Sequence, residues 1–353
     1  MSGRRANIIG AGLIGGSIGL ALRERGWHVS AIDRDADRLA RAVALGAGDG
    51  HGLDPQADIT FVAVPVLAVA SAVQRALAET SGLVTDVGSV KAPIVDAVDD
   101  ARFIGGHPMA GSEQEGLDGA DPTMFEGAVW VLTPTSDTDD EAFARLAALV
   151  SDFGADVVAL PPDRHDALVA VVSHVPHLTA VTLMGLASSR AEEHAALLRL
   201  AAGGFRDMTR IASGHPAIWP DICAQNRTAI VDTLDSLISG LQRVRGFVEA
   251  DDRAGLLAAL TEAREARVNL PMRGLRPSDL AEVRVPVPDR EGVAAEVFTL
   301  AAELGVNVFD FEVAHSAEGN RGVIIAVVDV TKADQFRAGL TGRGFHPSIH
   351  ALR

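Results

Sequence analysis

Residues 7–16 read NIIGAGLIGG, a short apolar run that leads directly into the spacing GxGxxG. The glycines of this motif are Gly10, Gly12 and Gly15. Apolar residues recur with helical spacing over 18–22, so the stretch predicts a strand, a tight turn and a helix. In that context the first glycine permits the turn, the second lets the backbone approach a pyrophosphate, and the third lets the helix pack closely on the strand. The stretch therefore predicts a Rossmann-type nucleotide-binding unit, and the alternative is a glycine-rich turn without a ligand.

An acidic residue follows at the spacing typical of dinucleotide-binding domains. The run His28–Ile32 predicts a second strand, and Asp33 follows it, about 20 residues beyond the glycines. A carboxylate there accepts hydrogen bonds from the ribose hydroxyls of NAD and repels the 2′-phosphate of NADP. We therefore expect NAD, while the neighbouring Arg34 leaves NADP as an alternative. The residues expected to bind the cofactor lie in the glycine turn and after the second and third strands: Gly10, Gly12, Leu13, Ile14, Gly15, Asp33, Arg34, Val64 and Pro65.

Further apolar runs extend this first domain over residues 1–160. The run 58–65 is typical of a strand buried on both faces of a parallel sheet. The strand-like runs that follow it are 83–87, 129–132 and 157–160. Ser89 and Lys91 lie just past the carboxyl end of one of these runs, at the edge where α/β sheets bind ligands. The alternative role for Ser89 is a helix N-cap, and Lys91 is expected to be a solvated surface lysine.

The segment 105–116, GGHPMAGSEQEG, carries the residue best suited to proton transfer. It follows the apolar residues Phe103 and Ile104, and its glycines and Pro108 predict a loop at the end of a strand. Such loops carry function in α/β folds, and the imidazole of His107 can take or give a proton near neutral pH. His107 is therefore the candidate catalytic residue, and the alternative is a loop histidine that is hydrogen-bonded to backbone.

Composition and charge exclude several functional classes. The chain has 353 residues, 48% of them hydrophobic, which is long enough for two or three domains. The formal net charge of −16 argues against nucleic acid and anionic membranes as partners. Cys223 is the single cysteine, which excludes an internal disulfide and a cysteine-based zinc site, and there is no tyrosine to act as acid or base. The N-terminus lacks a signal-peptide pattern and the apolar runs are too short to cross a bilayer, so we expect a cytoplasmic protein.

Strand-like runs disappear from the middle of the chain, which predicts an all-helical second domain over residues 161–270. Two long amphipathic patterns, 220–249 and 253–267, favour burial against a second copy of the chain, so we expect a homodimer. His174 and His177 lie three residues apart and would share a helix face. Because no carboxylate accompanies them at matching spacing, we expect no metal site.

The segment 203–210 contains two arginines that are candidates for carboxylate recognition. A guanidinium binds a carboxylate through two parallel hydrogen bonds, which gives both affinity and orientation. We expect this role for Arg210 and an ordinary surface position for Arg206.

Residues 269–277 contain two prolines and a glycine and predict a linker. Beyond the linker, strand-like and helical runs return in the order β, α, β, β, α over residues 278–353. That order is consistent with a small ferredoxin-like α+β domain. The sequence thus predicts an α/β protein with an N-terminal Rossmann-type domain, an all-helical dimerisation domain and a C-terminal ferredoxin-like domain.

Several motifs together resemble the prephenate dehydrogenase family of tyrosine biosynthesis, and the resemblance covers nearly the whole chain. The segments that carry it are Gly10–Gly15, Asp33, GSVK at 88–91, GHPMAG at 106–111, SHVPH at 173–177 and the run 203–219. The resemblance implies that His107 binds the 4-hydroxyl of the substrate and helps to remove its proton, and that Ser89 assists it.

The same resemblance implies the substrate contacts. Arg210 falls on the arginine that binds a substrate carboxylate, and His177 falls on the histidine that lies near the substrate side chain. His174 and Trp219, which belong to the same motifs, are expected to contact the substrate as well.

The chemistry implied by the resemblance fits these residue types. Prephenate carries a ring carboxylate and a carbinol para to it, so hydride transfer from the carbinol carbon to NAD gives a dienone that loses CO2 and becomes aromatic. The protein has to hold the carbinol against the nicotinamide, accept the hydroxyl proton and bind two carboxylates. Arogenate dehydrogenase, whose substrate carries an amino group on its side chain, is the alternative. A hydroxyacid dehydrogenase is disfavoured because it needs a differently placed lysine, and a non-catalytic sensor of NAD and an amino acid is the alternative from another class.

The tail resembles an ACT domain, which usually binds an amino acid between a loop after its first strand and a neighbouring domain. This implies an effector site at Asp289–Gly292 and Asn307, with tyrosine as the expected effector. Glu291 departs from the proline that usually precedes the glycine in ACT domains. The alternative is therefore a tail that only stabilises the dimer.

Overall fold

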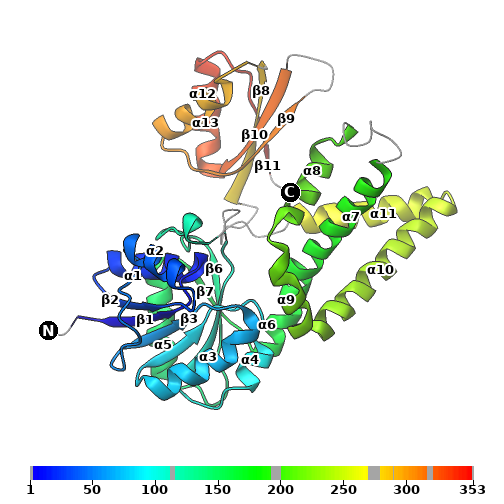
Figure 1. Ribbon diagram of the computed structural model, residues 1–353. Helices are drawn as coiled ribbons and strands as arrows, with labels where there is room; N and C mark the ends of the chain where they lie inside the picture. The colour runs from blue at the N-terminus through cyan, green and yellow to red at the C-terminus, as the bar shows by residue number, and fades with distance from the viewer. Residues whose placement is uncertain are drawn as a thin grey trace. The chain divides into compact units, whose positions relative to one another are not determined.

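The computed structural model describes residues 3–111, 116–191, 200–268, 279–288, 290–315 and 321–351 (Figure 1). The chain divides into two compact units, Met1–Gly240 and Leu241–Arg353. Helix α10 (Arg227–Glu249) crosses the point of division, and the domain boundaries proposed near residues 160 and 270 stay predictions. The predicted linker, 269–277, lies outside the described residues.

A seven-stranded sheet forms the centre of the first unit. Its strand order is β2-β1-β3-β4-β5-β6-β7, and every neighbouring pair is parallel except β5 and β6. The strands are β1 (Arg5–Ile9), β2 (His28–Ile32), β3 (Ile59–Val62), β4 (Leu83–Asp86), β5 (Phe103–Pro108), β6 (Val129–Thr133) and β7 (Asp156–Ala159). Each strand-like run expected before residue 160 is present, which confirms the α/β prediction for this part of the chain.

His107 lies within strand β5, so the prediction that it sits in a loop is wrong. The strand continues to its end at Pro108 because it pairs with the antiparallel neighbour β6, with His107 opposite Val131 and Pro108 opposite Trp130. A partner strand on one side supplies hydrogen bonds that the local glycine- and proline-rich sequence does not reveal. The imidazole is therefore carried by the sheet itself.

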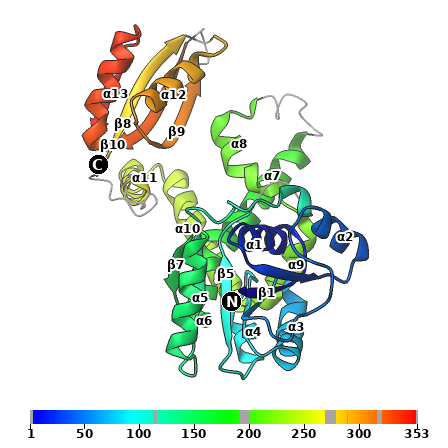
Figure 2. The same cartoon turned by 90° about the vertical axis from the view of Figure 1, so that its left-hand side faces the viewer.

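Helices cover both faces of this sheet (Figures 1 and 2). Those that connect its strands are α1 (Leu13–Glu24), α2 (Ala36–Ala44), α3 (Val66–Glu79), α4 (Ala92–Asp96) and α5 (Asp140–Asp152). Ile8 and Phe61 belong to the core formed with α1 and α5. The next residues along the same strands, Ile9 and Val62, belong to a separate core formed with α3 and α4. Adjacent residues thus point to opposite faces and both are buried, which explains the continuous apolar runs.

Glycines let helix α1 approach its neighbours closely. Gly10 has a φ of +96°, in the region that favours glycine, which confirms the predicted tight turn. A Cβ on Gly15 would lie 1.9 Å from the carbonyl oxygen of Gly10, and a Cβ on Gly19 would lie 2.0 Å from that of Ala47. A Cβ on Gly12 would meet no atom within 4 Å. The first and third glycines of the motif are therefore required by packing, whereas the second faces open space.

Helices fill the rest of the first unit, and the described residues from 160 to 268 contain no strand. In order they are α6 (Pro162–Val169), the π-helical turn η2 (Ala170–His174), α7 (Val175–Ala191), α8 (Gly203–Thr209), the 3₁₀ turns η4 (Arg210–Ser213) and η5 (Pro216–Ile218), α9 (Trp219–Gln225) and α10. Helix α11 (Arg253–Val268) belongs to the second unit. The helical prediction for this region is confirmed.

Two details of these helices differ from the prediction. The single helix expected over 220–249 is broken, because α9 ends at Gln225 and α10 begins at Arg227. Asn226 between them has a φ of −109° and a ψ of 33°, and its side chain is buried among hydrogen-bond partners. A proline is expected to kink or restart a helix, whereas Pro176 lies within α7 and the irregularity is the π-helical turn that precedes it.

By length and composition, the continuous helix Pro162–Arg190 could cross a membrane, with a mean hydropathy of 1.6 over its most apolar part. The prediction that the apolar runs are too short is wrong for this helix, because its histidine, serine and threonine residues interrupt the run without lowering its mean hydropathy far. His165, Asp166 and His174 of this helix are buried and hydrogen-bonded to protein groups. Length and composition alone are therefore weak evidence for a membrane span.

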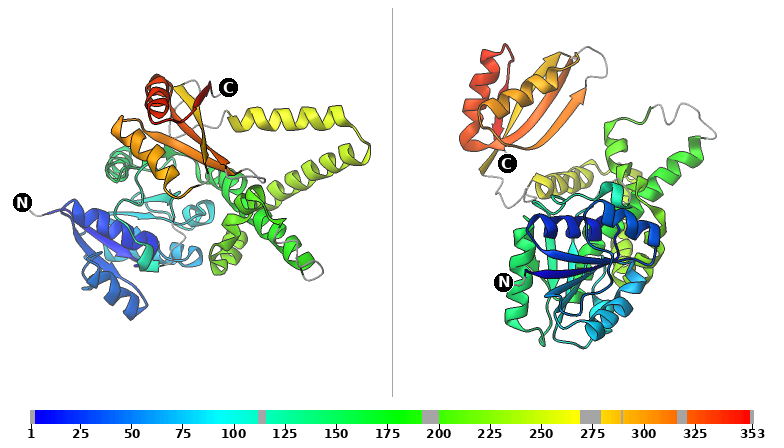
Figure 3. Two further views of the ribbon diagram at one scale, coloured as in Figure 1. Left: turned by 90° about the horizontal axis from the view of Figure 1, so that it is seen from above. Right: turned by 60° about the vertical axis from the view of Figure 1, so that its left-hand side comes forward.

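The second unit contains a four-stranded antiparallel sheet with the order β11-β8-β10-β9. Its elements are β8 (Leu280–Pro288), α12 (Val293–Glu303), β9 (Val308–His315), β10 (Arg321–Asp329), α13 (Val330–Gly342) and β11 (Ser348–Ala351). Val283, Val285 and Val287 alternate with exposed residues along β8 and pack with both helices, which lie on one face of the sheet (Figure 3). The predicted order β, α, β, β, α is confirmed, and the short strand β11 adds a final element.

Substitution of Gly19 by alanine tests the close approach of α1. The new Cβ would overlap the backbone of Ala47, so we expect Gly19→Ala to lower the free energy of unfolding by roughly 1–3 kcal/mol. Gly185→Ala on α7 is the matched control, because a Cβ there meets nothing within 4 Å and alanine favours a helix. Urea unfolding followed by tryptophan fluorescence measures both, since all three tryptophans lie in the first unit. An unchanged midpoint for Gly19→Ala would contradict the tight packing.

Candidate active site

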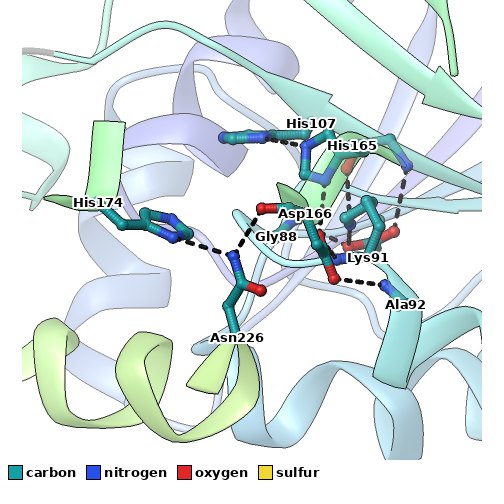
Figure 4. Close-up of polar contacts among 10 residues, drawn as sticks. Gly88, Lys91, Ala92, His107, His165, Asp166, His174 and Asn226 are labelled. Atoms are coloured by element: carbon teal, nitrogen blue, oxygen red, sulfur yellow. Dashed lines mark hydrogen bonds and ion pairs between the residues drawn. The ribbon is translucent and has the colours of Figure 1, made fainter. Parts of the chain in front are cut away.

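Three side chains form a hydrogen-bonded series at the end of β5 (Figure 4). Nδ1 of His107 lies 2.9 Å from Nε2 of His165, and Nδ1 of His165 lies 2.7 Å from Oδ1 of Asp166. His165 and Asp166 are buried on α6, while His107 keeps some accessible surface. The series thus runs from a partly accessible imidazole through a buried one to a buried carboxylate.

Backbone amides at the start of α4 hold the carboxylate of Asp166. Its Oδ1 accepts a hydrogen bond from the N–H of Lys91 at 2.8 Å, and its Oδ2 accepts one from the N–H of Ala92 at 2.9 Å. The side chain of Asn226 donates to the carbonyl oxygen of Asp166 at 2.9 Å. Helix α6 is therefore tied both to α4 and to the junction of α9 and α10 (Figure 4).

Lys91 is buried, so the prediction of a solvated surface lysine is wrong. Its ammonium forms an ion pair with Asp86, with both side chains 0% exposed, and donates to the carbonyl oxygen of Gly106 at 2.8 Å. Asp86 also accepts from the backbone N–H groups of Gly88 at 2.8 Å and Gly106 at 3.2 Å. Burial lowers the pKa of Lys91, and the charge of Asp86 opposes that shift. Lysine is rarely buried without a partner, and here the partner ends the preceding strand.

The environment of His107 favours its neutral form. Its pKa is held well below the ordinary value of 6.5, chiefly because protein atoms surround the ring densely although part of the residue remains accessible. Positive charge on His165, Lys91 and His174 would lower this pKa further. His107 is therefore neutral near pH 7, and a neutral imidazole can accept a proton.

His174, at the end of η2, is a second buried neutral histidine. Its Nδ1 lies 3.2 Å from the amide nitrogen of Asn226, which donates to it. Burial lowers the pKa of His174 to about 4, while the carboxylate of Asp166 opposes the shift. Because Nδ1 accepts, the proton of the neutral ring lies on Nε2, which makes His174 a hydrogen-bond donor.

His177 is directed to Trp219, and its ring stacks on the indole with a centroid distance of 3.6 Å and an interplanar angle of 10°. His174 meets the same indole edge-on at a centroid distance of 6.1 Å. Burial lowers the pKa of His177 as well. The three residues expected to contact a substrate thus form one cluster. Within the described ranges, no group of three or more His, Cys, Asp or Glu side chains is placed to hold a metal ion.

Arg210 and Ser89 lie in different elements. Arg210 begins η4, which packs against α7, the helix that carries His177. Ser89 is half-buried between β4 and α4, and its hydroxyl makes no hydrogen bond with another described residue. The N-cap of α4 is Lys91, so Ser89 does not have that role. Arg206 is exposed, and its guanidinium donates to the carbonyl oxygen of Ala201 at 3.3 Å, in agreement with the expected surface position.

The glycine turn fits a dinucleotide. Gly12 caps α1 without a side-chain hydrogen bond and faces open space, so the helix presents backbone amides to any group that enters. Asp33 follows β2, is 4% exposed, and accepts a hydrogen bond from the N–H of Ala11 at 2.9 Å. The other residues expected to bind the cofactor lie around this turn: Leu13 and Ile14 at the start of α1, Arg34 after Asp33, and Val64 and Pro65 between β3 and α3.

His165, Asp166 and Asn226 were not among the predicted site residues. No local signal singled them out, because His165 and Asp166 follow Asp163 and Arg164 in the polar first part of α6. Their contacts with His107 and Lys91 join positions 58 and 75 residues apart. A local pattern does not reveal such pairs.

Comparison with known proteins identifies two matched regions. Residues 18–159 match the nucleotide-binding domain of prephenate dehydrogenase, and residues 161–262 match its dimerization domain. The chain is 34% identical over 334 residues to a prephenate dehydrogenase of Bacillus subtilis (strain 168), with 90% of each chain covered. It is 33% identical over 278 residues to a cyclohexadienyl dehydrogenase of Zymomonas mobilis, with 74% of this chain and 94% of that protein covered.

Solved structures show the same architecture. Prephenate dehydrogenase from A. aeolicus, in complex with hydroxyphenyl propionate and NAD+, superposes with a TM-score of 0.70 at 28% identity, covering 76% of this chain and 98% of that one. Arogenate dehydrogenase from Synechocystis gives a TM-score of 0.65 at 29% identity, covering 74% and 98%. These matches confirm the predicted Rossmann-type and helical parts of the chain.

Breaking the buried ion pair is expected to destabilise the first unit. Lys91→Met leaves the carboxylate of Asp86 buried with backbone donors alone, and removal of one partner of a buried pair costs about 3–5 kcal/mol. The matched control, Arg75→Met, breaks the exposed pair with Glu79 and is expected to leave the unfolding midpoint nearly unchanged. Denaturant unfolding followed by tryptophan fluorescence compares the two variants. Equal losses of stability would show that burial of the pair has no special importance.

Proposed function

This chain belongs to the prephenate dehydrogenase family, and we propose that it is an NAD-dependent enzyme that converts prephenate to 4-hydroxyphenylpyruvate and CO2. The observation that carries the proposal is the neutral imidazole of His107 at the carboxyl end of β5. Strands β1, β3, β4 and β5 are parallel, so this end belongs to the same sheet edge as the glycine turn after β1. Ligands bind at that edge in α/β sheets.

NAD, when bound, would supply the acceptor for the hydride of the carbinol carbon. Backbone amides at the N-terminus of α1, which Gly12 leaves accessible, would hold the pyrophosphate. Asp33 would accept the ribose hydroxyls and repel the 2′-phosphate of NADP. The rim of the turn, including Val64, would pack against the cofactor.

His107 would accept the proton of the 4-hydroxyl as the ring carbonyl forms. Its low pKa keeps the ring neutral and able to do so. When CO2 leaves, the electron pair of the broken carbon–carbon bond makes the ring aromatic, and the proton returns from the imidazolium to the phenolate oxygen. The hydroxyl proton is thus taken up and returned within one turnover, and Ser89 would assist as a second group near the hydroxyl.

The cluster around Trp219 would bind the rest of the substrate. Arg210 would hold one carboxylate through paired hydrogen bonds. His174, with a proton on Nε2, would donate to an anionic or carbonyl oxygen without bringing a charge of its own. The stacked His177 would form a flat wall near the substrate side chain.

Arogenate is the second candidate substrate. The solved relative from Synechocystis is an arogenate dehydrogenase, and the relative from Zymomonas mobilis is a cyclohexadienyl dehydrogenase. The ring chemistry is the same for both substrates, and only the side chain differs. A direct comparison of the two substrates therefore decides between them.

A spectrophotometric assay with NAD and each substrate tests the proposed activity. Prephenate should give NADH, and His107→Asn should lower kcat by roughly 10²-fold or more while the Kd for NAD stays near normal, because a proton-transfer group is lost. His28→Gln is the matched control, since the side chain of His28 is 75% exposed, and it should keep the wild-type kcat.

The dependence of kcat/KM on pH gives a further check on the role of His107. Since the pKa of His107 is held below 6.5, kcat/KM should fall on the acid side only below that pH. Failure to form NADH with either substrate would overturn the proposed function. A normal kcat for His107→Asn would remove this residue from the mechanism.

We further propose that the chain is a cytoplasmic homodimer. A cavity of about 1280 Å³ lies along α6, α7 and α10 and is lined by apolar residues that include Leu168, Val171 and Leu183. Helix α10 also exposes apolar side chains at helical spacing, among them Ile238 and Leu241. A second copy of the chain would bury these surfaces.

The second unit supports a regulatory role. Its order β-α-β-β-α-β and its sheet order are those of a ferredoxin-like domain, and we propose that it is an ACT-like domain that binds tyrosine. The described part of the expected effector loop, 290–292, leads into α12 at Gly292, which has a φ of +81°. Arg290 pairs with Glu296 at 2.7 Å and thereby closes the loop that contains Glu291. Asn307 is exposed before β9, and Asp289 lies outside the described residues.

Inhibition by tyrosine tests this role. Millimolar tyrosine should inhibit the full-length chain, and phenylalanine, which lacks the phenol hydroxyl, is the matched control ligand. Control of the active site requires tyrosine to bind one conformation better than another, by about 1–3 kcal/mol. A chain that ends before Leu280 should be active and insensitive to tyrosine. The proposed regulation through this domain is wrong if tyrosine does not inhibit the full-length chain, or if tyrosine still inhibits the shortened chain.

A further inference from the structure

Resting on the proposed function, we infer that His165, oriented by Asp166, is a positioning residue that fixes His107 in the tautomer with an unprotonated Nε2. It acts through His107 and contacts neither substrate nor cofactor in this role. His165 and Asp166, two buried polar residues that take no direct part in the proposed reaction, thereby have a defined role.

The order of donors and acceptors follows from the last member of the series. The carboxylate of Asp166 can only accept, so Nδ1 of His165 carries the proton of the 2.7 Å hydrogen bond. With a single proton on the His165 ring, Nε2 is then a lone-pair acceptor. At 2.9 Å it accepts the Nδ1 proton of His107, which leaves the lone pair of His107 on Nε2.

The series is rigid because its far end has no freedom to turn. His165 is 0% exposed, and both oxygens of Asp166 are held by the backbone N–H groups of Lys91 and Ala92. Asn226 holds the carbonyl oxygen of Asp166 from the other side. A rotation of His165 would break its hydrogen bond with Asp166 and leave a buried donor without a partner, which is unfavourable.

The charges around His107 come from four elements. Lys91 at the start of α4 and Asp86 at the end of β4 neutralise each other in one ion pair. His165 and Asp166 come from α6, and His174 comes from η2 as a neutral donor. The carboxylate of Asp166 is the negative charge that reaches His107 through a hydrogen-bonded ring. It would stabilise the imidazolium that forms when His107 takes the proton.

The tautomer decides whether His107 can act as a base at Nε2. A neutral imidazole carries its proton on one nitrogen, and the partner of the other nitrogen selects which. If Nε2 carried the proton, it would donate to the substrate hydroxyl and could not receive the hydroxyl proton. In hydrolases that rely on an oriented histidine, a wrong tautomer lowers kcat by roughly 10⁴-fold.

Nitrogen NMR of histidine-labelled full-length protein reads the tautomer directly. His107 is one of 11 histidines, and its signals are assigned by their loss in His107→Asn. Near neutral pH, wild-type His107 should show a protonated Nδ1 and a bare Nε2. His165→Phe should lose this pattern, whereas His165→Gln, which keeps an acceptor oxygen, should retain it. A protonated Nε2 in the wild-type protein would overturn the inference.

Kinetics provide the second measurement. His165→Phe should lower kcat by roughly 10²-fold or more with little change in the Kd for NAD, and His165→Gln should recover at least tenfold of that loss. His28→Gln should change neither the tautomer nor kcat. A wild-type tautomer and kcat in His165→Phe would refute the positioning role. If that variant does not fold, the wild-type and His165→Gln spectra decide. If the wild-type protein oxidises neither substrate, the proposed function fails, and the spectra still decide the tautomer.

Discussion

The carboxylate of Asp166 is the contact on which the site depends. It orients His165 with one oxygen and binds the backbone at the start of α4 with both, so one side chain joins the sheet-based half of the first unit to its helices. The carbonyl oxygen of the same residue holds Asn226, which in turn holds His174. The proposed proton acceptor, His107, and the proposed hydrogen-bond donor, His174, are thus both connected to Asp166 through one intervening side chain.

Burial gives the two key histidines the same charge state and opposite roles. Desolvation is the main cause of the low pKa of both His107 and His174, so both rings are neutral. Their different partners then decide what each can do, because His107 donates through Nδ1 and His174 accepts at Nδ1. The ion pair of Lys91 and Asp86 supports this arrangement from within the sheet, where it fixes β4 to β5. The buried charges of Lys91 and Asp86 thus accompany each other, whereas the buried carboxylate of Asp166 is held by backbone N–H groups and His165.

The sequence predicts those parts of the fold whose signals are local. The turn at Gly10 and the strand that ends just before Asp33 follow from spacing, and the valines of β8 follow from alternation. The motif around His107 marks the candidate base, but its place in β5 depends on pairing with β6, which lies further along the chain. The burial of Lys91 and the contact between His165 and His107 depend on partners from other elements. Those contacts are set by packing, and a pattern of neighbouring residues carries no information about them.

Because of the π-helical turn between α6 and α7, the site depends on the number of residues that separate His165 from His174. His165 and His174 are nine residues apart, about two and a half turns of a regular α-helix, which would place them on opposite sides. The wider turn over Ala170–His174 absorbs roughly one residue and brings both rings toward the same side, where Asp166 and Asn226 meet them. The directions in which the side chains leave this helix are therefore as constrained as the identity of those side chains. Single-residue insertions and deletions between the two histidines are the changes that this segment tolerates least, even where every polar residue is kept.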